Sequence, residues 1–324
     1  MGTLSQYSVL LDGSNEYIEI GNVAALDFER TDPFSVSAWI RLNSTGAYVI
    51  ASKMAASTTF RGWAFETASA PYLQFSMYND FGGANRMSVR TTVAIPSGAV
   101  QAPYSTWHHV VATYSGSSTA AGVKLYIDGV EITSKTTVYD TLSATTLNTA
   151  SAQIGRRSDA TPLYFNGNID DVAVYDKELS AAEVLTIFNT YDPPNLTVTG
   201  PTANLVGYWK LGDGDTYPTA TDSSVSANNG TYTNTEARDI EPYAPLQNGM
   251  TTIETATEAS IYSPAEYLFG AIIGLAVYYK MRALANPGPG YETWVVSGIP
   301  DFTGTFAPGP IFAGTAVVAD YWES

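Results

Sequence analysis

Carboxylates are the residues of this chain whose spacing can be tested most directly against a reaction. Hydrolysis of a glycosidic bond uses two of them, about 5 Å apart in retaining enzymes. Alternate residues of a β-strand share a face, so a usable pair on one strand is separated by an even number of positions. Glu16 and Glu19 are three positions apart and are expected to face opposite ways. Asp170, Asp171 and Asp176 lie near a strand end and a helix start, where acidic side chains are usually caps or solvated charges, so we predict no catalytic residues.

Histidine and cysteine chemistry is equally limited. His108 and His109 are adjacent on a predicted strand, so their rings face opposite ways and cannot ligate one metal ion together. No Ser-His-Asp arrangement is evident in the sequence. The chain has no cysteine, which excludes disulfides and thiol catalysis and leaves the redox compartment open.

Acidic residues outnumber basic ones, 31 to 15, which gives a net charge of −16 over 324 residues. Binding of nucleic acid through its phosphates needs clustered Lys and Arg, so nucleic acid is not expected as a partner. The length allows one large domain and a smaller unit. The first residues, MGTLSQYSVLLDG, contain neither a basic nor an apolar stretch, and we therefore expect no signal peptide.

The elements that position these side chains are mostly strands. In FSVSAWIRL (34–42), apolar residues at alternate positions indicate a strand with one buried face. WHHVVATY (107–114) is a second strand, and VKLYIDGVEI (123–132) is a hairpin with Asp128-Gly129 at its turn. Many short strands without helices between them predict an antiparallel β-sandwich, so the fold class is mainly β.

Two helices are predicted. In ELSAAEVLTIF, Ser180 and Glu183 form a capping box, and the helix is expected to end near Asn189. A second capping box joins Ser263 and Glu266, which predicts a helix over about 264–285.

The second helix is apolar on all sides at its centre and must therefore be buried. Gly270 and Gly274 form a GxxxG face that allows close helix approach, so we predict that they take part in oligomerisation or anchoring. Glu266, Lys280 and Arg282 leave an uncharged run too short for a membrane span, which makes membrane insertion the less favoured alternative. Residues 246–324 are accordingly predicted to be a small C-terminal α+β assembly domain of a homo-oligomer.

Four segments follow one another in an order typical of a known family: YSVLLDGSNEYIEI, FSVSAWIRL, WHHVVATY with KLYIDGVEI, and FNGNIDDVAVYDKELSAAEV. Through these segments, residues 5–190 resemble the concanavalin A-like, laminin-G-type jelly-roll family. The resemblance implies a jelly-roll sandwich in which the adjacent histidines are structural. Trp39, Trp107 and Trp209 lie in core-like strand patterns and are interpreted as packing residues.

One family element stands in an unusual place. LVGYWKLGDGDTYPTATDSSVSANNGTYTN (205–234) is similar to the strand with which family members begin, yet here it follows the closing helix. The favoured interpretation is a circularly shifted order, in which 205–234 completes the sandwich of the same chain and the domain covers 1–245. Two alternatives are completion of a neighbouring copy's sandwich and a degenerate second domain.

The resemblance also implies candidate binding sites. Many family members hold calcium at a loop edge, and Asp12, Asn15 and Asp170 are the matching candidates, although Asp12 can equally form an Asx turn and Asp170 can cap buried N–H groups. The Glu-x-Asp-x-(x)-Glu run of the family's glycan hydrolases is absent. The candidate carbohydrate-binding residues are four aromatics in RGWAFETASAPYLQFSMYNDFGG, namely Trp63, Tyr72, Tyr78 and Phe81.

The shifted order of this laminin-G-like module resembles the arrangement found in bacteriophage virion proteins. The resemblance implies a non-enzymatic virion structural protein that displays a lectin-like module, as a capsid decoration, head fibre or tail fibre. Its expected partners are copies of itself, other virion proteins and a host-surface glycan. It would be made in the host cytoplasm and lie on the extracellular particle surface. The alternatives are a secreted carbohydrate-binding or glycan-processing protein and a membrane-anchored adhesin.

Overall fold

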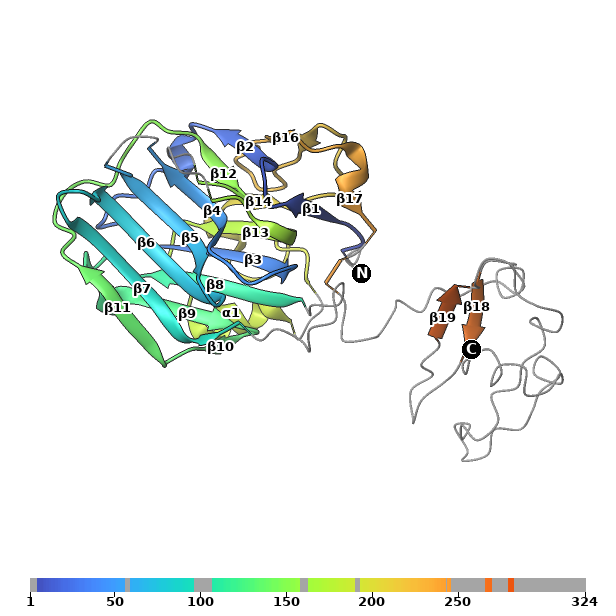
Figure 1. Cartoon of the computed structure of the whole chain (residues 1–324), viewed down its shortest axis with the longest axis horizontal. Helices are drawn as coiled ribbons and strands as arrows, with labels where there is room; N and C mark the ends of the chain where they lie inside the picture. Colours follow the sequence, from blue (N-terminus) through green and yellow to red (C-terminus); the bar gives the residue numbers. More distant parts are fainter. Residues whose placement is uncertain are drawn as a thin grey trace, which may run out of the picture. The chain divides into compact units, whose positions relative to one another are not determined.

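The computed structural model describes residues 5–55, 59–95, 107–157, 163–189, 193–242, 244–245, 266–269 and 279–282. The chain divides into two compact units, Met1–Leu246 and Gln247–Ser324. In the first unit, two antiparallel sheets face each other and form a jelly-roll sandwich, which confirms the predicted fold class (Figure 1). Short 3-10 turns connect some of the strands: η1 (Ala24–Leu26), η2 (Ala120–Gly122), η3 (Thr202–Asn204) and η4 (Ala237–Asp239).

The first sheet has eight strands and the second has nine. The eight-stranded sheet runs in the order β10 (Val130–Glu131), β9 (Val123–Ile127), β8 (His108–Tyr114), β3 (Phe34–Leu42), β13 (Asn166–Tyr175), β1 (Ser8–Asp12), β17 (Ile240–Glu241), with β14 (Leu205–Trp209) also paired to β13. The nine-stranded sheet runs in the order β11 (Lys135–Asp140), β7 (Asn85–Ala94), β6 (Tyr72–Asp80), β5 (Gly62–Ala68), β4 (Tyr48–Met54), β12 (Ala152–Ile154), β2 (Tyr17–Gly21), β16 (Gly230–Thr233), β15 (Thr219–Ala220).

The core lies between the two sheets and follows the alternation in the sequence. On β3, Phe34, Val36, Ala38 and Ile40 all belong to the core, as the period of two predicts. Trp39 lies on the other face of the same strand, where it packs with Trp107 and Phe188. All three tryptophans interpreted as packing residues are buried, and Trp209 is part of the main core.

Helix α1 (Ala181–Phe188) covers part of the outer face of the eight-stranded sheet. Its start is the predicted capping box: the backbone N–H of Glu183 donates to Ser180 Oγ at 3.3 Å, and the Ser180 N–H donates to the Glu183 carboxylate at 2.9 Å. The helix ends at Asn189, whose φ of 44° is left-handed. Val184 and Ile187 are buried in a cluster that includes sheet residues such as Tyr208.

The segment 205–234 supplies strands to both sheets of its own chain. Strand β14 pairs with β13, with Trp209 opposite Val172, and β16 pairs with β2, with Tyr232 opposite Ile18. Leu211 between these strands is also part of the core. The sandwich of residues 1–246 is thus closed by strands that come after its helix in the sequence.

The second unit differs from the sequence-based expectation. Residues Glu266–Phe269 and Tyr279–Arg282 are the strands β18 and β19, which pair antiparallel, so the helix predicted over about 264–285 is wrong for these two segments. The aromatic residues of both segments favour strands, and two interior glycines would each cost a helix about 1 kcal/mol. Gly270 and Gly274 lie outside the described residues. Within the part of the chain that was described, no helix has the length and apolar character needed to cross a membrane.

Candidate functional site

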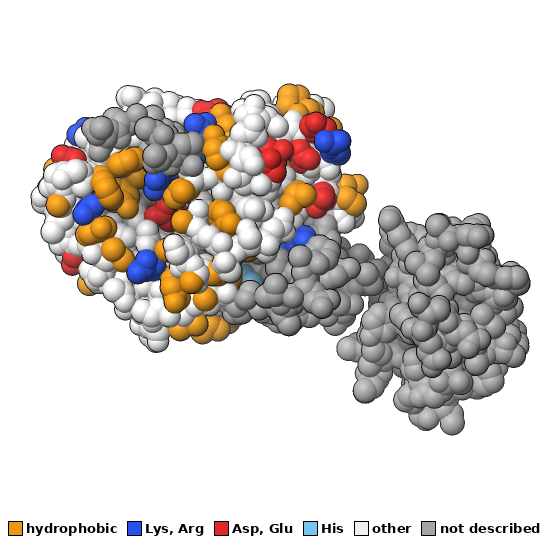
Figure 2. Space-filling view, viewed as in Figure 1, with side chains coloured by type: hydrophobic (Ala, Val, Ile, Leu, Met, Phe, Trp, Pro, Cys, Tyr) orange, Lys and Arg blue, Asp and Glu red, His pale blue; other side chains and the backbone are white. Residues whose placement is uncertain are grey.

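The outer face of the nine-stranded sheet is defined by strand alternation. On β5, β6 and β7, residues such as Trp63, Phe75 and Val89 point into the core, so their neighbours along each strand point outward. These outward residues are Ala64, Glu66, Tyr72, Gln74, Ser76, Tyr78, Arg86, Ser88 and Arg90. Figure 2 shows this side of the molecule, with patches of Lys and Arg side chains among hydrophobic ones over the strands β5–β7 and β11.

A row of four small side chains crosses the middle of this face. The pairing register places Ser52 opposite Ala64, Ala64 opposite Ser76, and Ser76 opposite Ser88. The hydroxyl oxygens of Ser76 and Ser88 are 2.9 Å apart and hydrogen-bonded. All four side chains of the row are buried.

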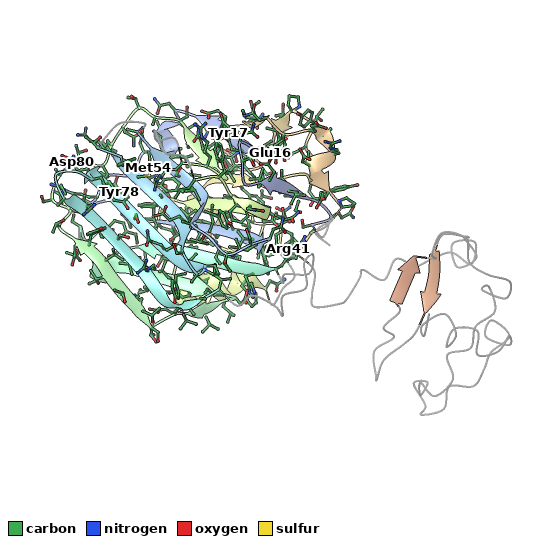
Figure 3. All side chains as sticks on the ribbon, in the orientation of Figure 1. Glu16, Tyr17, Arg41, Met54, Tyr78 and Asp80 are labelled. Carbon is green, nitrogen blue, oxygen red and sulfur yellow. The ribbon has the colours of Figure 1, made fainter. Side chains whose placement is uncertain are left out.

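On one side of the row stands a cluster of aromatic rings around an arginine. Tyr78 packs against Met54, and the ring of Phe81 lies 5.7 Å from that of Tyr78. The guanidinium of Arg86 lies 4.3 Å from the ring centre of Phe81 and 3.5 Å from that of Tyr139. Figure 3 shows Met54 and Tyr78 together at this end of the sheet. We call Tyr78, Phe81, Arg86 and Tyr139 the aromatic–arginine cluster.

On the other side of the row stand charged and amide groups. The Gln74 side-chain N–H donates to Glu66 Oε1 at 2.7 Å, and an Arg157 nitrogen lies 3.7 Å from Glu66 Oε2. The guanidinium of Arg90 lies 5.8 Å from the ring centre of Tyr72. The outer face therefore combines planar rings, hydrogen-bonding groups and cations on rigid strands.

A second polar group lies on the outer face of the eight-stranded sheet. Asp170 and Asp171 stand where the register of β13 with β3 shifts, and Asp171 has a φ of 45°. Burial raises the pKa of Asp170 well above its usual range, with the neighbouring Asp171 adding to the effect. Burial likewise raises the pKa of Asp171 to about 7.

The hydroxyl of Ser5 joins Asp170 to the turn after β14. Ser5 Oγ lies 2.7 Å from Asp170 Oδ2 and 2.8 Å from Asp213 Oδ2. One hydroxyl hydrogen can serve only one of these oxygens. The Ser5 hydroxyl therefore donates to one of the two carboxylates at a time, Asp170 or Asp213. Asp213 also accepts the backbone N–H of Gln6 at 2.8 Å, so this chain of bonds holds the N-terminal segment in place.

A comparison of the sequence with models of known protein families shows the family of this sandwich. The model of the concanavalin A-like lectin/glucanases superfamily matches residues 12–185, more than half of the chain. The chain belongs to this superfamily. This superfamily includes both lectins and glucanases, so membership alone leaves binding and hydrolysis open. No curated protein matches the chain.

Solved structures similar to this chain include three of different origin. A putative carbohydrate-binding protein from Bacteroides ovatus is 17% identical with a TM-score of 0.48, covering 71% of this chain and 59% of that one. A heptameric SAP-like pentraxin from Limulus polyphemus is 14% identical with a TM-score of 0.42, covering 58% and 84%. Botulinum neurotoxin type C, described as interacting with two ganglioside molecules, is 21% identical with a TM-score of 0.35, covering 49% and 35%. The chain thus spans less than two thirds of the first and third of these proteins.

The structure separates the four aromatics predicted to bind carbohydrate. Trp63 is wrong as a carbohydrate-contacting residue, because its side chain is 2% exposed in the core and its indole N–H donates to the Leu26 carbonyl at 3.0 Å. Tyr78 and Phe81 lie together, with Tyr78 largely covered and Phe81 41% exposed. Tyr72 lies on the same face six residues along β6, about 20 Å away. The same face also carries Arg86 and Arg90, which the sequence analysis did not consider, although their alternation with Ser88 in RMSVR places all three on one face.

The three calcium candidates are not brought together. Asp12 Oδ1 accepts the backbone N–H groups of Ser14 at 2.7 Å and Asn15 at 3.4 Å, which is an Asx turn. Asp12 pairs with Asn166, four residues along β13 from Asp170 and therefore about 13 Å away. No group of three or more acidic, histidine or cysteine side chains suited to a metal ion occurs among the described residues.

Both histidines have structural surroundings. His108 Nδ1 lies 2.7 Å from Asp128 Oδ2, and the backbone N–H of His109 donates to Asp128 Oδ1 at 3.0 Å. Asp128 opens the turn between β9 and β10, so the pair fixes that hairpin to β8. The ring of His109 packs on Trp39 with ring centres 5.1 Å apart, and burial lowers the pKa of His109 to about 3.

The acids of the outer face do not form the carboxylate pair of a glucanase. Glu66 on β5 and Glu19 on β2 both point outward, but β4 and β12 lie between their strands. Three strand spacings amount to about 14 Å, whereas the two carboxylates of a glycosidase are about 5–9.5 Å apart. Glu19 moreover accepts the Gln153 side-chain N–H at 2.6 Å.

Proposed function

We propose that the sandwich is a non-catalytic carbohydrate-binding module and that it binds its ligand on the outer face of the nine-stranded sheet, at the aromatic–arginine cluster. The observation that carries this proposal is Phe81, an exposed ring held by Tyr78 and Arg86 on rigid strands. Carbohydrate sites combine an apolar platform with a few placed hydrogen-bonding groups, and both are present on this face. Membership of a superfamily named for lectins and glucanases supports the same ligand class.

Binding is favoured over hydrolysis by the arrangement of carboxylates. Glu66 is the buried acid nearest to the small-residue row, and it is engaged by Gln74 and Arg157. Glu19, the second outward acid considered above, is too distant to act with it. A carboxylate that lacks a partner across the sugar cannot supply both the acid and the nucleophile or base that the reaction needs.

The test of this proposal is a glycan array probed with the full chain, followed by titration calorimetry on the strongest ligand. Phe81→Ala should weaken binding about tenfold or more, because it removes the exposed ring of the platform. Val225→Ala, which truncates another highly exposed apolar side chain, is the control and should bind as the unmodified protein does. If Phe81→Ala binds the ligand as tightly as the unmodified protein does, this placement of the site is contradicted. Turnover of the ligand would favour the glycan-processing alternative.

We further propose that the module is displayed on a virion by the unit formed by residues 247–324, as a capsid decoration, head fibre or tail fibre. The support is the layout of the chain, a sandwich followed by a separate compact unit. Display of this kind requires assembly with copies of the chain or with other virion proteins. The proposal would be contradicted if the protein has the native mass of a single chain in every buffer tested and is also absent from purified virions. Partitioning of the chain into detergent would favour the membrane-anchored adhesin instead.

A further inference from the structure

We propose that the ligand of the outer face is an anionic oligosaccharide and that Arg86 and Arg90 bind its carboxylate or sulfate groups. This inference rests on the proposed carbohydrate-binding function and names the class of ligand. Three observations carry it: the contacts of Arg86 with two aromatic rings, the lack of ion pairs to either arginine among the described residues, and their neutral cross-strand neighbours.

Arg86 is held in place by rings rather than by a carboxylate. Its guanidinium lies between Phe81 at 4.3 Å and Tyr139 at 3.5 Å. Its Nε is buried and has no hydrogen-bond partner among the described residues. Contacts with two rings restrict the orientation of the guanidinium, and a planar fork of terminal N–H groups matches the two oxygens of a carboxylate or sulfate.

Arg90 points outward from the same strand. It is four residues from Arg86, so the two Cα atoms are separated by about 13 Å. Its guanidinium lies 5.8 Å from the ring centre of Tyr72. Within the described ranges, neither Arg86 nor Arg90 forms an ion pair, whereas Arg157 on this face lies against Glu66 and Arg238 pairs with Glu236 elsewhere.

The neighbours of the two arginines show that the sheet does not use them for cross-strand ion pairs. Tyr78 stands opposite Arg86 on β6, and Arg90 stands opposite Gln74 on β6 and Thr136 on β11. All three neighbours are uncharged. A pair of opposite charges across the ladder would stabilise the sheet by up to about 1 kcal/mol, and none of these neighbours offers such a charge.

The charge of the whole chain limits the size and charge of such a ligand. A net charge of −16 repels any anion at long range, and it repels a highly charged polyanion such as nucleic acid more strongly than a short oligosaccharide with a few acidic groups. Two cations about 13 Å apart can instead hold separate acidic groups of one short chain, while Phe81 supplies an apolar surface for a sugar ring. Uronic acids, sialic acids and sulfated sugars all present such groups.

The experiment compares acidic oligosaccharides with their neutral forms on the full chain. The array contains uronate-, sialate- and sulfate-bearing glycans, each beside its methyl-esterified or desulfated counterpart, so the carboxylate and sulfate sources are distinguished. The best acidic ligand is titrated against Arg86→Gln, Arg86→Lys and Arg90→Gln. Arg238→Gln is the matched control, since its side chain is 79% exposed and lies on η4.

We expect the acidic form to bind at least about tenfold more tightly than its neutral counterpart, and each Gln variant to lose about tenfold of that affinity. Arg86→Lys should lose affinity too, because lysine keeps the charge but not the fork. If the neutral form binds as tightly as the acidic form or more tightly, and the variants bind with the affinity of the unmodified protein, the inference is overturned. The carbohydrate-binding function would then still stand. Binding of no glycan of any class would contradict both. Circular dichroism of each variant verifies that it is folded. If Arg86→Gln does not fold, the affinity of Arg90→Gln decides the test.

Discussion

The hydroxyl of Tyr208 donates a 2.5 Å hydrogen bond to the carboxylate of Asp171 in the buried part of the eight-stranded sheet. Tyr208 belongs to β14 and Asp171 to β13, so the bond joins the strand that comes late in the sequence to the strand at the centre of the sheet. It also lowers the pKa of Asp171 against the larger raising effect of burial.

Tyr208→Phe should therefore destabilise the sandwich. The substitution leaves the buried carboxyl of Asp171 without this donor, which typically costs about 1–3 kcal/mol. Thermal unfolding followed by circular dichroism should show a lower melting temperature by about 2–4 °C for each kcal/mol. Tyr17→Phe, at a half-exposed tyrosine of β2, serves as the control. An unchanged melting temperature in the Tyr208 variant would mean that the bond adds nothing to stability.

The stability of the sandwich should fall as the pH rises from about 4 to 7. In the folded protein, burial raises the pKa of Asp170 well above the ordinary value and that of Asp171 to about 7. Between the unfolded and folded pKa values the folded state holds protons that the unfolded state releases, so raising the pH favours unfolding. Urea titrations across this range should show the decrease, and Asp170→Asn should reduce its slope. Asp12→Asn is the control and should leave the slope of stability against pH unchanged. If Asp170→Asn also leaves the slope unchanged, the effect belongs to other groups.

Residues 200–245 should be indispensable for the sandwich. Their removal deletes β14, β15, β16 and β17, takes Trp209 and Tyr232 out of the core and exposes strand edges on β13 and β2. Exposed edges promote aggregation, so the deleted protein should precipitate on expression. A deletion variant that stays in solution and melts at the original temperature would contradict intramolecular completion. A dimer of the intact chain that dissociates only on unfolding would favour exchange of this segment between copies.

Trp63 and Phe81 should affect different properties. Trp63→Ala removes a core side chain and should cost about 3–5 kcal/mol of stability, with glycan affinity unchanged in the fraction that folds. Phe81→Ala should leave stability within about 0.5 kcal/mol and reduce glycan affinity. Melting curves and calorimetry on both variants check this separation, and a binding defect caused by Trp63→Phe at unchanged stability would reverse our assignment of that residue.

Calcium binding stays a proposal from the family resemblance, and a direct test is available. The described residues near Asp12 supply few of the six to eight oxygens that calcium takes, so we expect the same melting temperature in calcium and in EDTA. A higher melting temperature in calcium than in EDTA, lost in the Asp12→Asn variant, would support a calcium site at Asp12.

The sequence predicted the sandwich because alternation on strands such as 34–42 is decided locally by which face is buried. It failed at 264–285 because the capping box of Ser263 and Glu266 is also a local signal, and it was overridden where the aromatic segments pair as strands. Trp63 was misassigned although it lies two positions from Phe65, a core residue, and so shares a strand face with it. The alternation along a strand shows which residues share a face, but it does not show which of the two faces meets the core.

The environment of Asp170 was beyond sequence reasoning for a different reason. Its hydrogen-bonding partner Ser5 is 165 residues away along the chain, and Asp213 is 208 residues from Ser5. No local pattern links such positions. The aromatic–arginine cluster has the same character on a smaller scale, since Arg86 and Tyr139 come from strands that meet only in the folded sheet.

The pairing of β13 has a consequence for synthesis of the protein. One edge of this strand is occupied by β1 as far as Ile169 and by β14 from Val172 onward. Translation proceeds at about 5–20 residues per second, so the ribosome must add the residues up to 209 before the second half of that edge can be covered. During this interval the nascent chain carries an open strand edge and an incomplete core. Folding of the sandwich therefore cannot be completed before β14 has been synthesised, and a ribosome stalled before residue 205 should hold a chain that recruits chaperones.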